Sequence, residues 1–125
     1  MKGLILLKGP GTSILNGEKI VEIRSCRTHK RERIGIIICG TKKVWGTVEI
    51  YDCVELTKEL YEGLWKDKHK SSKIYEEILQ TYPKPYAWLL KDAKTFKEAI
   101  SYKHKNGCIT WLNIDNMTNN LKNNL

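Results

Sequence analysis

The sequence contains few of the features that mark disordered, fibrous or membrane proteins. Only 3 proline and 9 glycine residues occur among 125, while 41% of the residues are hydrophobic and 29% are charged. This balance excludes a disordered, collagen-like or low-complexity chain. The longest notable apolar run, Ile34 to Cys39, is far shorter than the ~20 residues of a membrane-spanning helix. The apolar run Gly3 to Leu7 is too short for a signal peptide. We therefore expect one soluble domain that is not exported.

Acidic residues are in the minority. There are 14 of them against 22 lysine and arginine residues, which gives a formal net charge of +8. A small domain with this excess favours polyanionic partners, above all nucleic acid. The excess of positive charge can also be unrelated to binding. Extra lysine can serve solubility alone, and the abundance of Lys, Asn and Ile can reflect an AT-rich genome. The charge indicates a class of partner and nothing finer.

Metal-ligand spacings are also missing. The four cysteines form no CxxC pair, and no histidine lies at a ligand spacing from any of them. We therefore predict no metal site and no cofactor, in a reducing cytoplasm. Three cysteines lie in apolar runs and are expected to pack as small hydrophobes: Cys39, Cys53 and Cys108. Each histidine stands beside a lysine, which indicates solvated loops for His29, His69 and His104.

Hydrophobic periodicity predicts strands with short helices between them. Apolar or alternating runs indicate strands over residues 3–7, 20–24, 34–39, 86–90 and 108–114. Thr12 and Gly17 are expected to cap and stop a single helical turn. Two further helices are predicted to open at Thr57 and Ser72, separated by a basic loop over 66–73.

The clearest strand is predicted over residues 43–55. Most of its aliphatic residues fall on one parity and its charged and aromatic residues on the other, which is the alternation of a half-buried strand. Gly46 is expected at a bulge or bend. Trp45 lies on the charged parity and is a candidate exposed aromatic platform.

The predicted fold belongs to the α+β class. The elements add up to roughly six strands with two or three short helices beside them, and no βαβ repeat is visible. A small closed or partly open β-barrel is therefore favoured over a parallel sheet. We expect the domain to span residues 1–114. Six asparagines fall between Asn113 and Leu125, so the tail over residues 115–125 is expected to be frayed.

The densest charge lies in residues 17–33. If residues 20–24 form a strand, Val21 and Ile23 face the core while Glu22 and Arg24 face the opposite side. One interpretation is an ordinary salt-bridged sheet edge. The other is a site where lysine and arginine bind phosphates and Glu22 orients them or acts as a base. Lys19 precedes the strand, so periodicity does not fix its direction.

The same segment carries a resemblance to a known family. The sequence reads Leu15-x-Gly17-x-Lys19-x-x-Glu22-x-Arg24. This pattern strongly resembles the ASCH domain family, whose fold is similar to the PUA domain. The resemblance covers residues 4 to 114 and continues through 28–36, 46–49, 86–89 and 100–105. It implies a small stand-alone ASCH domain with a PUA-like β-barrel.

The resemblance also implies a function. ASCH domains are thought to bind or act on RNA, often in the control of translation or transcription, so the implied partner is RNA or a nucleotide-like ligand. The family's cleft lysine, glutamate and arginine correspond to Lys19, Glu22 and Arg24. Trp88 either fills the core or offers a stacking surface to a base. The candidate nucleic-acid-binding residues are Lys19, Glu22, Arg24, Arg27, Trp88 and Lys103.

Catalysis is the alternative that the resemblance leaves open. One branch of the family removes the acetyl group from acetylated cytidine, and another is a ribonuclease. The amidohydrolase branch places a threonine nucleophile three residues after the lysine, where this chain has Glu22. Acyl transfer would then need another hydroxyl, such as Thr47, activated by Lys19. If the chain is an enzyme, Lys19 and Glu22 are the expected catalytic residues.

Overall fold

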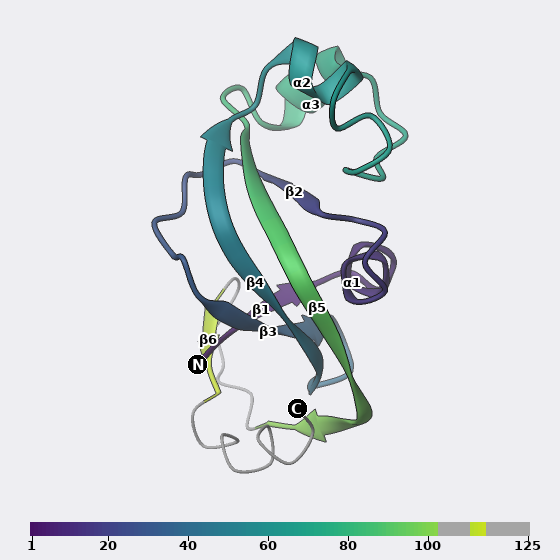
Figure 1. The fold of residues 1–125 in the computed structure, drawn as a ribbon, viewed down its shortest axis with the longest axis vertical. Coiled ribbons are helices and arrows are strands. Elements are labelled where there is room, and N and C mark those ends of the chain that lie inside the picture. Colours follow the sequence, from purple (N-terminus) through teal and green to yellow (C-terminus); the bar gives the residue numbers. More distant parts are fainter. Residues whose placement is uncertain (103–110, 115–125) are drawn as a thin grey trace.

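The structure, a computed structural model, describes residues 1–102 and 111–114. Within these residues, six strands form one curled sheet that makes a half-barrel, with three short helices beside it (Figure 1). In chain order the elements are β1 (Lys2–Leu6), α1 (Lys8–Leu15), β2 (Val21–Arg24), β3 (Arg33–Ile38), β4 (Lys43–Glu55), α2 (Lys58–Glu62), α3 (Tyr75–Thr81), β5 (Tyr86–Ser101) and β6 (Trp111–Asn113). The predicted partly open barrel of the α+β class is confirmed.

The order of strands across the sheet is β2-β5-β4-β3-β1-β6. Strands β1 and β3 run parallel, and the other described neighbours are antiparallel. The long strands β4 and β5 extend along most of the molecule (Figure 1). Strand β5 continues well beyond the predicted 86–90, because its polar second half pairs with β4 as far as Ser101. Periodicity alone predicts no strand there, since few apolar residues mark it.

A bulge interrupts β4 where the sequence predicts one. Gly46 pairs with Ile36 of β3, and the next pair joins Val44 to Ile37. Trp45 is therefore the extra residue, and its side chain is 37% exposed. An extra residue in one strand increases the local twist. The bulge thus helps the sheet to curl around its core.

Two of the predicted helix starts are wrong. Helix α1 begins at Lys8 rather than Thr12, because Pro10 lies in the first turn, where its missing N–H costs nothing. Helix α3 begins at Tyr75 rather than Ser72, and the main-chain N–H of Ile74 donates to the side chain of Glu77 at 3.2 Å. The third start is confirmed, since the hydroxyl of Thr57 caps α2.

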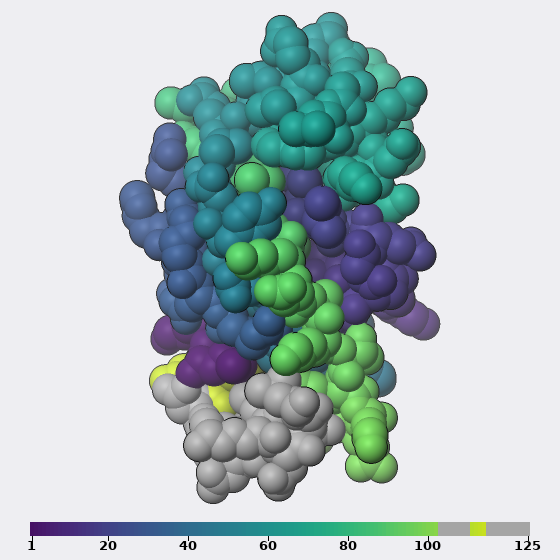
Figure 2. Space-filling model, in the orientation of Figure 1, coloured from purple at the N-terminus to yellow at the C-terminus, as the bar shows by residue number. Residues whose placement is uncertain are grey.

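Two apolar clusters place the helices on the sheet. One fills the half-barrel beneath α1 and includes Leu4, Ile14, Ile36, Ile50 and Trp88. The other joins α2 and α3 to β2 and β5 through Val21, Leu56, Tyr61, Ile78 and Ala87. Figure 2 shows the α2–α3 segment gathered at one end of the molecule, next to the purple residues of α1 and its flanks. A main-chain hydrogen bond of 3.0 Å from Ile20 to Lys68 joins the two parts.

Several expectations lie outside the described residues, among them the solvated loop at His104, the start of the last strand at 108–110 and the frayed tail at 115–125. The described part of that strand, β6, pairs with β1. None of the helices within 1–102 and 111–114 is long and apolar enough to cross a membrane.

Candidate functional site

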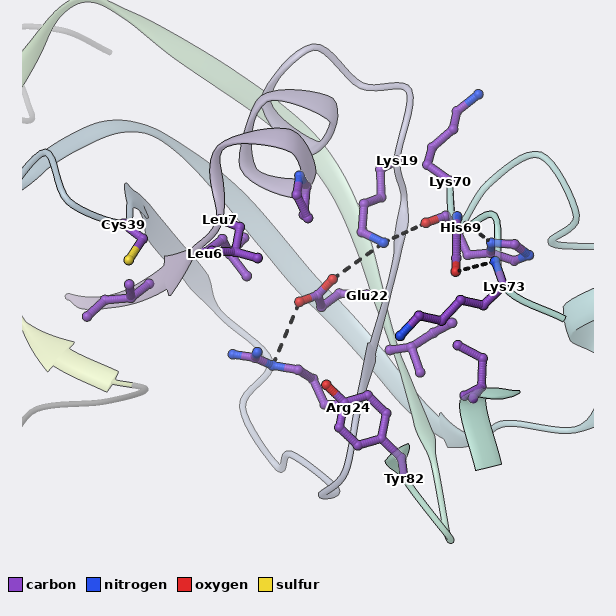
Figure 3. A pocket seen from close by; sticks show the side chains of 15 residues that line it. Leu6, Leu7, Lys19, Glu22, Arg24, Cys39, His69, Lys70, Lys73 and Tyr82 are labelled. Carbon is purple, nitrogen blue, oxygen red and sulfur yellow. Dashed lines mark hydrogen bonds and ion pairs between the residues drawn. The ribbon is translucent and has the colours of Figure 1, made fainter. Parts of the chain in front are cut away.

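A pocket of about 450 Å³ opens between the β1–α1 junction, β2 and the α2–α3 loop, residues 63–74. Its apolar wall includes Ile5, Leu6 and Leu7. Its polar side consists mainly of Lys19, Glu22, Arg24, His69, Lys70 and Lys73 (Figure 3). We call this site the cationic pocket. It brings together two segments that are far apart in the sequence.

Lys19 is fixed in the wall of the cationic pocket. Its main-chain N–H donates to Ser13 of α1 at 2.9 Å. Its ammonium group donates to the main-chain oxygen of His69 at 2.6 Å and lies 3.5 Å from a carboxylate oxygen of Glu22. The residue is only 8% exposed. Burial lowers the pKa of Lys19, and the nearby carboxylate of Glu22 opposes part of that shift.

Glu22 lies between two cations. One carboxylate oxygen faces Lys19, and the other is 3.8 Å from Nε of Arg24. The guanidinium of Arg24 lies over the ring of Trp88, 5.4 Å from its centroid. The structure therefore brings together the three side chains of the Lys-x-x-Glu-x-Arg pattern. Burial of a carboxylate costs free energy unless such partners compensate for its charge.

His69 is a pocket residue that the sequence analysis missed. The expectation of a solvated loop is wrong, because His69 is 4% exposed and its ring stacks on Tyr61 at 3.9 Å. Its Nδ1 accepts the main-chain N–H of Ser71 at 2.9 Å, so Nε2 carries the proton and faces the oxygen of Tyr61 at 3.2 Å. Burial lowers the pKa of His69, and the charge of Lys19 adds to this effect. No local pattern could have shown these contacts.

Two lysines of the basic loop line the pocket. In Figure 3 the side chain of Lys73 points toward Glu22, whereas that of Lys70 points away. Lys70 has a left-handed backbone with a φ of 58°, which turns the chain at the pocket edge. Counting Arg24 and Lys19, the described lining has four cationic side chains against the single carboxylate of Glu22. The described lining therefore has an excess of positive charge.

Two other candidate residues lie elsewhere. Trp88 is 1% exposed, stacks on Trp111 at 5.8 Å and donates to the oxygen of Cys26 at 2.9 Å. Its ring belongs to the core and offers no open face to a base, so the core interpretation is the one that fits. Arg27 lies outside the cationic pocket, over the ring of Tyr86 at 4.9 Å. Lys103 lies outside the described residues.

The hydroxyl suggested for acyl transfer is not in this pocket. Thr47 is fully buried and accepts a hydrogen bond of 2.8 Å from Arg33.

Of the cysteines expected to be buried, Cys53 is buried, but Cys39 is exposed and lines the cationic pocket because it follows the end of β3. Cys108 lies outside the described residues. Within 1–102 and 111–114, no group of three or more His, Cys, Asp or Glu side chains could hold a metal ion.

Comparison with known proteins gives the family. Residues 4–100 match the model of the ASCH domain. The chain belongs to the ASCH domain family. The match runs from within β1 to within β5 and includes every residue named above as lining the cationic pocket. No curated protein matches this ASCH chain.

Solved structures share the fold of this ASCH domain. An ASCH protein from Zymomonas mobilis superposes with a TM-score of 0.71 at 21% identity, covering 98% of this chain and 93% of that one. Its tyrosine-to-phenylalanine variant gives 0.73 at 21% identity with coverages of 98% and 96%. Its serine-to-alanine variant gives 0.70 at 20%, with 98% and 94%. These likenesses confirm the PUA-like fold of the chain.

The pocket of this ASCH domain offers three kinds of chemistry. Arg24 and Lys73 can bind the oxygens of a phosphate. The carboxylate of Glu22 can accept hydrogen bonds from N–H groups. The buried amine of Lys19, with its lowered pKa, can release a proton more readily than an exposed lysine.

Proposed function

We propose that this ASCH domain binds single-stranded RNA, or a nucleotide, in the cationic pocket. The single observation that carries the proposal is the excess of cations in the pocket, four against one carboxylate. Arg24 and Lys73 bind phosphate oxygens, and Glu22 accepts N–H groups of a base. The link of ASCH domains with RNA, and their association with translation and transcription, make cellular RNA the first partner to test.

The burial of the charged side chains supports the interpretation as a ligand-binding site over that of an ordinary ion pair at the sheet surface. Glu22 and Lys19 are 7% and 8% exposed, so their geometry is fixed before a ligand arrives. Lys73 is exposed and turned toward them (Figure 3). A rigid polar floor with an exposed cation above it suits a ligand that has both a phosphate and a hydrogen-bonding edge. The free thiols of Cys26 and Cys39 fit action in a reducing cytoplasm.

Fluorescence anisotropy with a short labelled single-stranded RNA tests this proposal. We expect the affinity to fall steeply with salt, because each neutralised phosphate releases counterions. Lys73→Ala should weaken binding and lower the slope of log affinity against log salt concentration by about 1, which corresponds to one phosphate contact. Lys97→Ala is the matched control, because Lys97 is also exposed and lies outside the pocket. Equal losses in the two variants, or binding insensitive to salt, would contradict the assignment.

One observation favours a hydrolase as the second candidate. The lowered pKa of Lys19 is a property that a general base requires, and the hydroxyl of Ser71 belongs to the same pocket. Incubation with acetylated cytidine, or with RNA, followed by chromatography would reveal the product. Release of cytidine that Lys19→Met abolishes, while circular dichroism shows the variant still folded, would support an amidohydrolase. RNA fragments lost in the same variant would support a ribonuclease.

A further inference from the structure

A second pocket of about 390 Å³ shares Lys19 with the cationic pocket. It lies between α1, β4 and β5, and we call it the Tyr51 pocket after the aromatic ring in its lining. We propose that the Tyr51 pocket binds a nucleobase of the same RNA strand whose phosphate occupies the cationic pocket. The proposal rests on the function proposed above and adds a second nucleotide position to it.

The Tyr51 pocket has a floor suited to a planar apolar group. Ile14 of α1, Val48 of β4 and Leu90 of β5 line it, and each of these side chains is buried to 3% exposure or less. Its volume falls within the range of pockets that bind small molecules. A nucleobase above this buried apolar floor therefore meets mainly the exposed side chains of the rim, among them Tyr51.

Tyr51 supplies a stacking partner. Its side chain is 43% exposed although it lies in the long strand β4. The ammonium of Lys91 lies 5.3 Å from the ring centroid and is also 3.6 Å from Glu49. Both contacts are solvent-exposed and hence weak. A base stacked on the ring gains more than these contacts, while Lys91 keeps Glu49 as its partner.

The charges separate the roles of the two pockets. Beside the Tyr51 pocket, Lys19 and Lys91 are matched by Asp92 in the lining and by Glu49, the partner of Lys91. This balance gives no preference for a phosphate, unlike the excess in the cationic pocket. Asp92 adds an exposed carboxylate that can accept from an exocyclic amino group. The chemistry favours a base with such a group, namely adenine, guanine or cytosine.

The shared residue places the two pockets next to each other. Lys19 belongs to both linings and is held by α1 on one side and the α2–α3 loop on the other. Successive nucleotides of one strand can then place a phosphate in the cationic pocket and a neighbouring base against Tyr51. Single-stranded nucleic acid is commonly held by this combination of cations and aromatic rings.

Anisotropy with short labelled oligoadenylate, and with the same strand carrying abasic residues, tests the proposal. Tyr51→Ala should weaken oligoadenylate binding about five- to a hundredfold and leave the salt slope unchanged. Tyr51→Phe keeps the ring and should bind within about twofold of the original protein. Trp45→Ala is the matched control, because Trp45 is an exposed ring of the same strand outside both pockets. The abasic strand should bind Tyr51→Ala and the original protein equally.

The outcomes distinguish this inference from the function on which it rests. If Lys73→Ala weakens binding while Tyr51→Ala does not, the base position is overturned and RNA binding in the cationic pocket stands. An equal loss with Trp45→Ala, or a loss with the abasic strand, also overturns it. If the original protein binds neither strand, both proposals fail together. Circular dichroism melting of each variant shows whether the fold is retained.

Discussion

The ammonium group of Lys19 donates a hydrogen bond to the main-chain oxygen of His69 across 2.6 Å, although the two residues are 50 positions apart. The bond joins the α1–β2 connection to the α2–α3 loop, which form facing sides of the cationic pocket. Each partner is buried to less than 10% exposure. The position of the site's central amine therefore depends on how a distant loop folds.

Lys19→Met should destabilise the fold. The substitution keeps the length of the side chain but leaves the oxygen of His69 without its donor and removes one of the cations beside Glu22. We expect the free energy of unfolding to fall by about 2–4 kcal/mol, because buried polar groups lose their partners. Urea unfolding followed by circular dichroism measures the change.

The control for this variant is Lys58→Met. Lys58 makes a similarly short contact of 2.6 Å with Glu76, but both side chains are 53% exposed. Water replaces such a contact, so the urea midpoint should not move measurably. Equal destabilisation by the two variants would show that burial of Lys19 does not set the strength of its contacts.

Acid should destabilise the protein through His69. Burial lowers the pKa of the folded imidazole below its usual 6.5, so the unfolded chain binds more protons between the lowered value and 6.5. The free energy of unfolding must then rise with pH across that window and fall on acidification. His69→Gln removes this contribution, and its stability should fall less than that of the original protein between about pH 7.5 and about pH 5.5. Urea unfolding at the two pH values provides the comparison.

His29→Gln is the control for the pH experiment, because the side chain of His29 is exposed. We expect it to keep the pH dependence of the original protein. If His69→Gln loses as much stability on acidification as the original protein does, proton binding by His69 contributes nothing and the pH dependence comes from other groups.

Local patterns predicted the elements whose signals are complete within a few residues. The alternation over 43–55 predicts both ends of β4, and Thr57 caps α2 because a hydroxyl there meets the N–H of Leu60. Gly46 likewise indicates its bulge. Helix α1 begins four residues before the predicted position. The sequence does not indicate this first turn, because it contains Gly9 and Pro10. The weak propensities of these two residues are overridden by packing of the helix on β3 and β4.

The site was only partly predictable for a different reason. The spacing of Glu22 and Arg24 on one strand could be derived from the sequence, but the partners of Lys19 and His69 depend on tertiary contacts. A histidine between two lysines is the usual pattern of an exposed loop. Here Tyr61 stacks on the ring and excludes water from it, and no local signal indicates that contact.

Trp88→Phe should lower the free energy of unfolding, because the Trp88 ring packs in the core. The change removes the N–H that donates to Cys26 and shrinks the ring that contacts both Arg24 and the stacked Trp111. We expect a loss of roughly 2 kcal/mol in unfolding free energy from the cavity and the unpaired oxygen. The control is Trp45→Phe, an exposed ring with its own N–H contact to Thr41. The free energy of unfolding of this control should change by no more than about 0.5 kcal/mol. A loss as large as that of Trp88→Phe would contradict the conclusion that burial of the Trp88 ring stabilises the fold.

Gly46→Ala tests whether the bulge in β4 is needed for the fold. An added Cβ would overlap the main-chain oxygen of Lys94 and lie 2.7 Å from a methyl carbon of Leu15. Main chain cannot move aside as a flexible side chain does, so β5 must shift and the side chain of Leu15 must move. We expect a loss of about 2–4 kcal/mol, measured by urea unfolding. Gly9→Ala meets nothing within 4 Å in helix α1, and it should be neutral or stabilising by up to about 1 kcal/mol. If both variants keep the original stability, β4 and β5 can separate at the bulge without cost, and close packing at Gly46 does not hold α1 against the sheet.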